Sequence, residues 1–524
     1  MKKYLDKQQY FKVLIYLLLA VGIFFRCYNI DSKLYWHDEV YTSIRTAGYN
    51  GQEIVSQAFN GEVISPRDFV KYQSLSTNKT WGDTLTKLIE HPEHPPLYYL
   101  LSRGWQELFG SSIAATRSLS VVFSLLLFPV VYWLCWELFN NTKVGWWTSG
   151  IIAVSPVHVI YAQEAREYSL LVLITTITCL TLLKAVKHNN WLWWSFYAVS
   201  LATNFYVSLI AAYIAIAQAF YIVFLERFRL NKVTINFILS GIASLVLFAP
   251  WLWVILSNYE ILKAKTSWTN MTRPFIELFH AWELHLSSIF IDLHPSINGY
   301  IASRIFGFLV VFIFICYRLV YRQNKPQTWL LLFSITIIPT VMLILPDLID
   351  GGIKSIMTRY FLPSILMIQI AVAYWLSQIK TWRDIKRSLS IFLIVTFGII
   401  SCGISSQSVT WWNKVVGFHN ATIAEIINNY ERPLLIANTT VIDNNHDVNV
   451  GDLISLSYLL DDKVKLLLFK NQNLPSINYD RYDNVFLWDI QEESRIEFQE
   501  INNCELEIVE GEYDPPLWQM RSPK

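Results

Sequence analysis

Long apolar stretches that are almost free of charge alternate with short polar segments along most of this chain. The first stretch lies between Lys12 and Arg26, which enclose 13 uncharged residues. Because basic side chains at helix ends can extend toward the lipid headgroups, the span is expected to reach from about residue 10 to residue 28. No small-residue cleavage site follows, so the stretch is interpreted as an uncleaved signal anchor with its N-terminus in the cytoplasm.

Ten more spans are predicted, each near the roughly 20 residues that a helix needs to cross the hydrocarbon core. The 38 uncharged residues between Lys187 and Glu226 are too many for one crossing, so we divide them into two helices that turn near residues 204–206. The spans predicted after the first cover residues 114–138, 144–161, 169–186, 188–225 (as two helices), 234–256, 300–317, 328–345, 360–379 and 389–406.

The short loops predict the orientation of these spans. Cytoplasmic loops of membrane proteins are enriched in lysine and arginine, and every second connection here is basic. The basic residues in these connections are Lys143, Lys184, Lys187, Arg227, Arg229, Lys232, Arg318, Arg322, Lys325, Lys380, Arg383, Lys386 and Arg387. With eleven spans, the long polar loops 30–112 and 257–298 and the C-terminal segment lie outside. A count of ten or twelve would instead place the C-terminal segment in the cytoplasm.

The segment after residue 406 has a different pattern. Strands are predicted at residues 433–438, 464–469 and 484–488, and a helix at residues 452–460, which is typical of a small α/β unit. The predicted fold is therefore a polytopic α-helical membrane protein with a small extracytoplasmic α/β domain at its C-terminus. The predicted domains are residues 1–406 for the transmembrane part and residues 407–524 for the soluble part.

Composition and charge agree with this division. Hydrophobic residues make up 53% of the 524 residues and charged residues only 16%, compared with about a quarter in soluble domains. Residues 407–524 contain 19 acidic and 9 basic residues, a net charge of −10, so the rest of the chain carries +11. Such asymmetry indicates a lipid-embedded part and an acidic soluble part. The six cysteines have no metal-like or disulfide-like spacing.

The candidate chemistry lies on the outer side. Trp36-His37-Asp38-Glu39 places two adjacent carboxylates among aromatic residues just outside the first span. The simplest alternative is a solvated charge pair in a loop. Several arginines stand at or near the outer ends of spans, where the orientation rule does not put them: Arg103, Arg117, Arg166, Arg304 and Arg359.

For each arginine considered separately, an ion pair with Glu164, Glu167 or Asp347 explains its position as well as an anionic ligand does. Taken together, they favour an anionic ligand at the outer surface, because the guanidinium fork suits phosphate. Group transfer from a lipid-linked phosphate uses all these residue types. Cations stabilise the charge that develops on the phosphate, and a carboxylate takes the proton from the attacking hydroxyl.

The sequence resembles the C-type, multi-spanning glycosyltransferases, in the branch that holds the protein O-mannosyltransferases and the lipid A aminoarabinose transferase. The resemblance covers about residues 10–380 and leaves out the C-terminal segment. The residues that carry it are Trp36-His-Asp-Glu, His94-Pro-Pro-Leu-Tyr-Tyr with Arg103, Thr116-Arg-Ser-Leu-Ser, Gln163-Glu-Ala-Arg-Glu-Tyr and Thr358-Arg-Tyr-Phe-Leu-Pro.

This resemblance implies roles for individual residues. Asp38 matches the general base toward the acceptor, and Glu39 is its catalytic neighbour, with a supporting or metal-related role that differs among family members. Donor-phosphate contacts are implied for Arg117, Arg166 and Arg359. The residues expected to bind substrate are His37, His91, His94, Arg103, Glu164, Tyr168 and Tyr360. The implied reaction is direct displacement, with inversion, of a hexosyl or pentosyl group from a polyprenyl phosphate, without a covalent intermediate.

The expected partners are a polyprenyl-phosphate sugar donor, a lipid, glycan or protein acceptor, and membrane lipids, but no nucleic acid. Some related enzymes need a divalent metal. The ligand types available here, on Asp38, Glu39, His37, His91 and His94, have no diagnostic spacing, so no cofactor is assigned and a divalent metal stays open as an alternative. The expected location is the plasma membrane, with the active site on its extracytoplasmic face. The competing interpretations are a transporter or lipid-linked-sugar flippase and a structural or sensory membrane protein.

Overall fold

The computed structural model describes residues 2–293, 295–379, 384–439, 448–470, 481–509, 511, 513 and 515–521. The chain divides into two compact units. Unit 1 consists of residues 1–30, 91–98 and 117–408, and unit 2 consists of residues 31–90, 99–116 and 409–524. Most of the predicted outer loop 30–112 therefore belongs to the same compact unit as the C-terminal segment, while residues 91–98 belong to unit 1. The predicted boundary between a transmembrane domain (residues 1–406) and a soluble domain (residues 407–524) stays a prediction.

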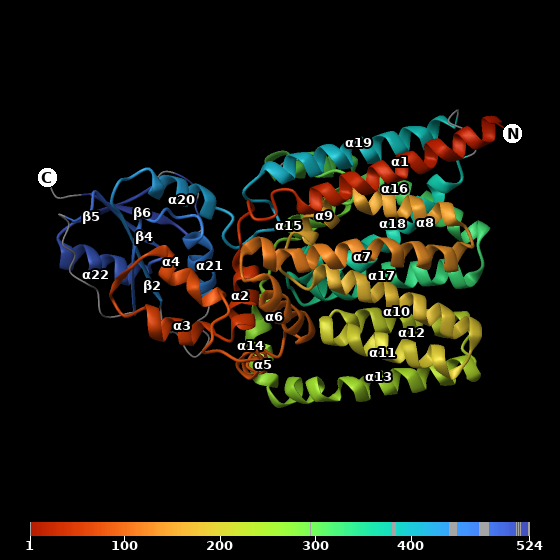
Figure 1. The fold of residues 1–524 in the computed structure, drawn as a ribbon, viewed down its shortest axis with the longest axis horizontal. Coiled ribbons are helices and arrows are strands. Elements are labelled where there is room, and N and C mark those ends of the chain that lie inside the picture. The colour runs from red at the N-terminus through yellow and green to blue at the C-terminus, as the bar shows by residue number, and fades with distance from the viewer. Residues whose placement is uncertain are drawn as a thin grey trace. The chain divides into compact units, whose positions relative to one another are not determined.

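Unit 1 is helical, and its long helices run side by side in Figure 1. Among them, α10 packs against α11, α12 against α17, and α8 against α18. The elements that belong wholly or mainly to this unit are α1 (Lys2–Cys27), α7 (Ile113–Phe139), α8 (Thr142–Ala153), α9 (Pro156–Ala162), α10 (Tyr168–His188), α11 (Trp191–Val207), α12 (Ala211–Leu225), α13 (Lys232–Ser257), α14 (Tyr259–Thr266), η2 (Ser267–Asn270), α15 (Phe275–Ser287), α16 (Pro295–Gln323), α17 (Pro326–Ile349), η3 (Lys354–Ile356), η4 (Thr358–Phe361), α18 (Leu362–Ser377) and α19 (Ile385–Gln407).

The polytopic helical architecture is confirmed. Within the described part of the chain, eight helices are long and apolar enough to cross a membrane, and α12 is a shorter apolar helix of 15 residues. The predicted fifth and sixth spans correspond to α11 and α12, which turn at residues 208–210, slightly later than expected. The count of eleven spans and the outside position of the C-terminal segment stay predictions.

The predicted third span is broken in two, because α8 ends at Ala153 and α9 begins at Pro156. The last carbonyls of a helix have no partner within it and need donors from elsewhere. Arg26 supplies them, since its guanidinium donates to the carbonyl oxygens of Ile152 at 2.9 Å and Ala153 at 2.8 Å. Its Nε also donates to Ser124 Oγ at 2.8 Å. The expectation that Arg26 extends toward the headgroups is therefore wrong; its side chain is fully buried.

Two glycines allow helices to approach closely around the same break. A Cβ atom added at Gly22 of α1 would lie 2.4 Å from the carbonyl oxygen of Ala153. One added at Gly398 of α19 would lie 2.5 Å from the carbonyl oxygen of Val154. Real Cβ atoms are not found at such distances, so the packing of α1 and α19 against the end of α8 requires glycine at both positions.

Unit 2 is built around a six-stranded mixed sheet with the order β1-β3-β2-β4-β6-β5. Strands β2, β3 and β4 are parallel neighbours, while β1, β6 and β5 pair antiparallel. The elements of this unit are α2 (His37–Ala47), α3 (Gly51–Ala58), β1 (Val63–Ile64), α4 (Pro66–Val70), η1 (Lys71–Gln73), α5 (Trp81–Ile89), α6 (Leu97–Phe109), α20 (Asn420–Asn428), β2 (Pro433–Thr439), α21 (Val448–Ser457), β3 (Lys465–Lys470), β4 (Asn484–Trp488), α22 (Glu492–Asn502), β5 (Glu505–Ile508) and β6 (Leu517–Arg521).

The predicted C-terminal α/β unit is confirmed, and the structure adds strands to it. The three predicted strands are β2, β3 and β4, and the predicted helix is α21. The strand β1 comes from the predicted outer loop 30–112, where Val63 pairs with Leu467 and Ile64 with Leu466 of β3. This two-residue strand joins the loop to the sheet of the C-terminal segment.

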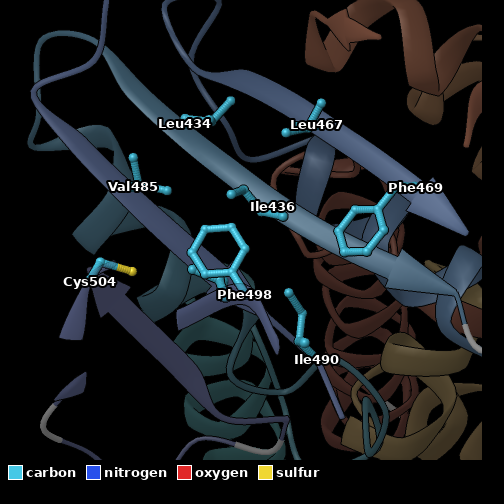
Figure 2. Packing of buried hydrophobic residues seen from close by; sticks show 9 residues of the cluster. Leu434, Ile436, Leu467, Phe469, Val485, Ile490, Phe498 and Cys504 are labelled. Carbon is cyan, nitrogen blue, oxygen red and sulfur yellow. The ribbon is translucent and has the colours of Figure 1, made fainter. Parts of the chain in front are cut away.

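The central strands of unit 2 are buried on both faces of the sheet, and one hydrophobic cluster lies on one of these faces. Figure 2 shows side chains from the three parallel strands gathered with Phe498 of α22. Ile436, at the centre, is fully buried and Phe498 is 0% exposed. Burying each such side chain contributes about 1.5–3 kcal/mol, so this cluster is a main source of the unit's stability.

Candidate active site

Two arginines of unit 1 converge on one tyrosine ring. Arg166 lies in the turn between α9 and α10, Arg359 lies in η4, and we call them the arginine pair. The guanidinium carbons of Arg166 and Arg359 are 5.6 Å and 5.9 Å from the ring centroid of Tyr168. Arg359 also lies 5.5 Å from the ring of Tyr360. Both arginine side chains are buried.

The arginine pair suits phosphate. A guanidinium presents planar donors that match the oxygens of a phosphate, and charges interact more strongly where water is excluded. Nε of Arg166 lies 3.2 Å from Oε2 of Glu167, so one of the predicted ion pairs is present. Glu164 is buried in the same turn, with 1% of its surface exposed.

Hydrogen bonds to neighbouring helices fix the turn that carries Arg166. Gln163 Nε2 donates to the carbonyl oxygens of Phe25 and Tyr28, both at 2.9 Å, and so caps the end of α1. The carbonyl oxygen of Arg166 accepts from Ser120 Oγ at 3.1 Å. These bonds hold the backbone of residues 163–166 against α1 and α7.

Arg117 is fully buried near the start of α7. Its Nη1 donates to the carbonyl oxygen of Ile30 at 2.8 Å, which ties α7 to the end of the first span. The contacts with Tyr168 that define the arginine pair come from Arg166 and Arg359. A role for Arg117 in donor binding stays a prediction.

The two predicted histidines of the first outer loop lie on either side of a carboxylate. Glu93 Oε1 is 3.4 Å from His91 Nδ1 and 3.6 Å from His94 Nε2. His91 is buried and His94 is partly exposed. Glu93 was not among the residues predicted from the sequence, although it lies between two histidines in a segment that also holds three prolines.

In unit 2, the predicted carboxylates stand in the first turn of α2. Asp38 is half-buried, whereas Glu39 is fully buried and pairs with Lys414, with 3.2 Å between Oε2 and Nζ. The ammonium of Lys414 also lies 5.3 Å from the ring centroid of Trp36. His37 stacks edge-on against Tyr41, one turn along the helix. Asp38 is thus the more accessible of the two carboxylates.

The importance of Lys414 was missed by the sequence analysis. The only signal was that Lys414 is the single Lys or Arg between residues 388 and 431. A buried lysine is rare unless it is paired, and here it is 1% exposed. Its partner is 375 residues earlier in the chain.

Arg103 of α6 makes contacts within unit 2. Its guanidinium donates to Thr84 Oγ1 at 2.7 Å and to the carbonyl oxygens of Lys79 at 2.8 Å and Thr46 at 3.1 Å. These bonds link α6 to α2 and α5. Arg103 therefore shapes its surroundings in unit 2, and its predicted contact with substrate remains untested.

Metal binding has no geometric support among the residues that the structure describes. In those ranges, no group of three or more His, Cys, Asp or Glu side chains could hold a metal ion.

Comparisons with known proteins add a family and a fold. The model of the family described as dolichyl-phosphate-mannose-protein mannosyltransferase matches residues 93–254, a little under a third of the chain. The crystal structure of ArnT from Cupriavidus metallidurans bound to undecaprenyl phosphate has a TM-score of 0.50 at 12% identity, and the match covers 97% of each chain. No curated protein matches the sequence.

A second solved structure is the apo oligosaccharyltransferase of Archaeoglobus fulgidus, with a TM-score of 0.47 and 11% identity. That match covers 91% of this chain and 66% of the archaeal one. The match to ArnT shows a shared fold along nearly the whole length of both chains. Fold and family match together indicate a multi-pass membrane glycosyltransferase, and the chain resembles the C-type enzymes of the protein mannosyltransferase and ArnT group.

Proposed function

We propose that this protein transfers one sugar from a polyprenyl-phosphate carrier to an acceptor hydroxyl on the extracytoplasmic face of the plasma membrane. The observation that carries the proposal is the arginine pair on Tyr168, in unit 1. A lipid-linked donor is consistent with the shared fold, because the matching ArnT structure is described as bound to undecaprenyl phosphate.

In this reaction the acceptor oxygen forms a bond to the anomeric carbon as the bond from that carbon to the phosphate oxygen breaks. The phosphate leaves with the bonding electrons. Arg166 and Arg359 would stabilise the negative charge that develops on the phosphate. Stabilising developing charge is usually the largest single contribution to catalysis. Displacement from the opposite side inverts the anomeric centre.

Asp38 would take the proton from the acceptor hydroxyl. Asp38 lies in the first turn of α2, where the partial positive charge of a helix N-terminus interacts favourably with an anion. General-base catalysis contributes typically about 10²–10⁴-fold to a rate. Glu39 is paired with Lys414, so we assign it to holding this turn in place and Asp38 to the chemistry.

The transporter or flippase alternative is not favoured by the family match or the fold. It would move a lipid-linked sugar across the membrane and leave its phosphate bond intact. A transferase releases polyprenyl phosphate and forms a new glycosidic bond. The two functions therefore leave different products.

The test uses the full chain in nanodiscs with polyprenyl phosphates that carry radiolabelled sugars. Asp38→Asn should lose transfer by at least about 100-fold while donor binding is retained. Arg166→Ala should weaken donor binding about tenfold or more, because it removes charge-assisted hydrogen bonds. Arg304→Ala is the matched control, since Arg304 is an exposed arginine that lies over Tyr300, in a span end that is predicted to be on the outer side.

Two results would contradict the proposal. One is full transfer activity in Asp38→Asn. The other is equal loss of donor binding in Arg166→Ala and Arg304→Ala, which would point to a general effect of outer-face charge. An intact donor that appears only on the opposite side of a vesicle would support the flippase instead.

A further inference from the structure

Unit 2 contains a cavity of about 930 Å³, and all of its lining residues belong to that unit. This volume falls within the range of small-molecule sites, about 300–1,000 Å³. One wall is the segment from residue 74 to residue 79, and the other is formed by the end of α6 and residues 110–113. A hydrogen bond of 3.1 Å from the backbone nitrogen of Leu75 to Ser111 Oγ holds the two walls together.

The lining of this cavity is basic and rich in hydroxyl groups. Four cations and one carboxylate line it, together with serines and a threonine. Three of the cations have acidic partners: Arg67 pairs with Asp462, Lys79 with Glu53 at 2.5 Å, and Arg103 with Glu107 at 3.4 Å.

Lys71 is the cation that remains. Within the part of the chain that the structure describes, it forms no ion pair, although its ammonium lies 5.3 Å from the ring of Tyr72. The nearby carboxylate of Asp68 accepts hydrogen bonds from the backbone nitrogen and Oγ of Ser65, at 3.1 Å and 2.8 Å. These bonds are the main reason that the pKa of Asp68 is lowered, and Lys71 contributes less. Lys71 is thus available to an anionic group in the cavity.

Two residues that line the cavity, Gln106 and Ser76, have buried side-chain oxygens without a hydrogen-bond partner among the described residues. Gln106 is 2% exposed, and its Nε2 lies 3.3 Å from Ser102 Oγ. Its Oε1 has no hydrogen-bond partner among the described residues, and neither does the buried Oγ of Ser76. Because an unsatisfied buried polar atom costs about 1–3 kcal/mol, these two atoms indicate a ligand with hydroxyl groups.

A contact joins the cavity to the segment that carries Asp38. Tyr458 lines the cavity, and its ring packs edge-on against Tyr35, with the centroids 5.5 Å apart. Tyr35 is three residues before Asp38 and is held by a bond of 2.5 Å between its hydroxyl and Ser43 Oγ of α2. A ligand in this cavity therefore lies against the same framework that positions the proposed base.

We infer that this cavity binds a saccharide that carries a negative charge, with Lys71 contacting the charged group and Gln106 and Ser76 bonding to sugar hydroxyls. The charged group is a phosphate or a carboxylate, both of which a lysine ammonium recognises. The inference that this saccharide is the acceptor rests on the proposed function. The inference that the cavity binds a charged saccharide does not depend on it.

The test is calorimetric titration of the full chain in phosphatidylcholine nanodiscs with three probes that share one β-1,4-linked disaccharide skeleton. These are uncharged cellobiose, cellobiose 6′-phosphate and cellobiouronic acid. A charged probe should bind more tightly than cellobiose, and whichever of the two binds more tightly identifies the anionic group. Lys71→Glu should weaken the charged probe about tenfold or more and leave cellobiose unchanged.

Two further variants make the result decisive. Gln106→Leu should weaken all probes that bind, because it removes a contact to hydroxyl groups and leaves Lys71 in place. Lys263→Glu, on the exposed side of α14 in unit 1, changes the net charge equally and should have no effect.

The inference is overturned if no charged probe binds, or if Lys71→Glu and Lys263→Glu behave alike. A protein that transfers sugar but binds no probe contradicts the cavity assignment and leaves the proposed function intact. If the protein binds the charged probe through Lys71 but never transfers sugar to it, the saccharide site is supported. The assignment of this site to the acceptor is then wrong.

Discussion

The buried pair of Glu39 and Lys414 gives the sharpest prediction about the framework around Asp38. Both side chains are at most 1% exposed, and the two charged atoms are 3.2 Å apart. Removing one partner of a buried ion pair leaves the other charge desolvated and costs about 3–5 kcal/mol. When both charges are removed together, no unpaired buried charge remains, so this desolvation cost is avoided.

We therefore expect Glu39→Gln and Lys414→Met each to destabilise unit 2 by about 3–5 kcal/mol. The double variant should lose clearly less than the sum, so that the coupling energy is about 3 kcal/mol. For a unit of this size, each kcal/mol shifts the midpoint of unfolding by about 2–4 °C, so each single variant should melt roughly 6–20 °C lower.

Cys504 provides an assay that reports on unit 2 alone. It is the single cysteine in the residue ranges of that unit, and it is buried in the core that Figure 2 shows. Alkylation of Cys504 during a temperature ramp, measured by mass spectrometry of its peptide, gives the midpoint. Lys463→Met is the matched control, because its ammonium lies 3.8 Å from Asp461 on the surface and should change stability by less than about 1 kcal/mol.

The reasoning is refuted if Lys414→Met melts like Lys463→Met, or if the effects of the two single variants simply add. Either result would mean that water reaches the pair. Glu39 would then be available to share the chemistry with Asp38.

Three other predictions concern the supports of the site. Arg26→Met should destabilise unit 1 by several kcal/mol in chemical denaturation, because it uncaps α8, whereas Lys12→Met should not. Gly451→Ala should reduce transfer but not donor binding, since a Cβ there would lie 2.4 Å from the ring of Tyr41 and 3.1 Å from His37 Nδ1; normal transfer would contradict this. Burial lowers the pKa of His285 from 6.5 to about 4, so the unfolded chain takes up a proton that the folded chain does not as pH falls below about 6.5. Stability should fall by up to about 3 kcal/mol between pH 7 and pH 4, and thermal melts of His285→Gln should lose that part of the pH dependence.

The elements were predictable where their signal is local. The long apolar stretches and the strands at residues 433–439, 465–470 and 484–488 appear much as their periodicity predicts. The two-residue strand β1 has no such signal, because its pairing with β3 is set by a partner some 400 residues away. The break between α8 and α9 was also not predicted, because it lies within a segment without charged residues. Pro156, at which α9 begins, was the available signal.

The residues of the candidate site could be predicted from the sequence, but their arrangement in space could not. The sequence analysis singled out Arg166, Arg359 and Tyr168 from their place near span ends and from a family resemblance. Their convergence on one ring is a property of the folded helices. Arg26 was misjudged because a basic residue at the end of a span usually extends to the headgroups, while here unpaired carbonyl groups of α8 lie close enough to bind it.

The most direct test of the central claim is mass spectrometry of the lipids that co-purify with the wild-type protein, Asp38→Asn and Arg166→Ala. The account predicts a polyprenyl phosphate sugar that is enriched on Asp38→Asn, where it binds but cannot react, and depleted on Arg166→Ala. The mass of the sugar would also identify the donor. If none of the three proteins retains such a lipid and supplied polyprenyl phosphate does not bind, the transferase account is contradicted.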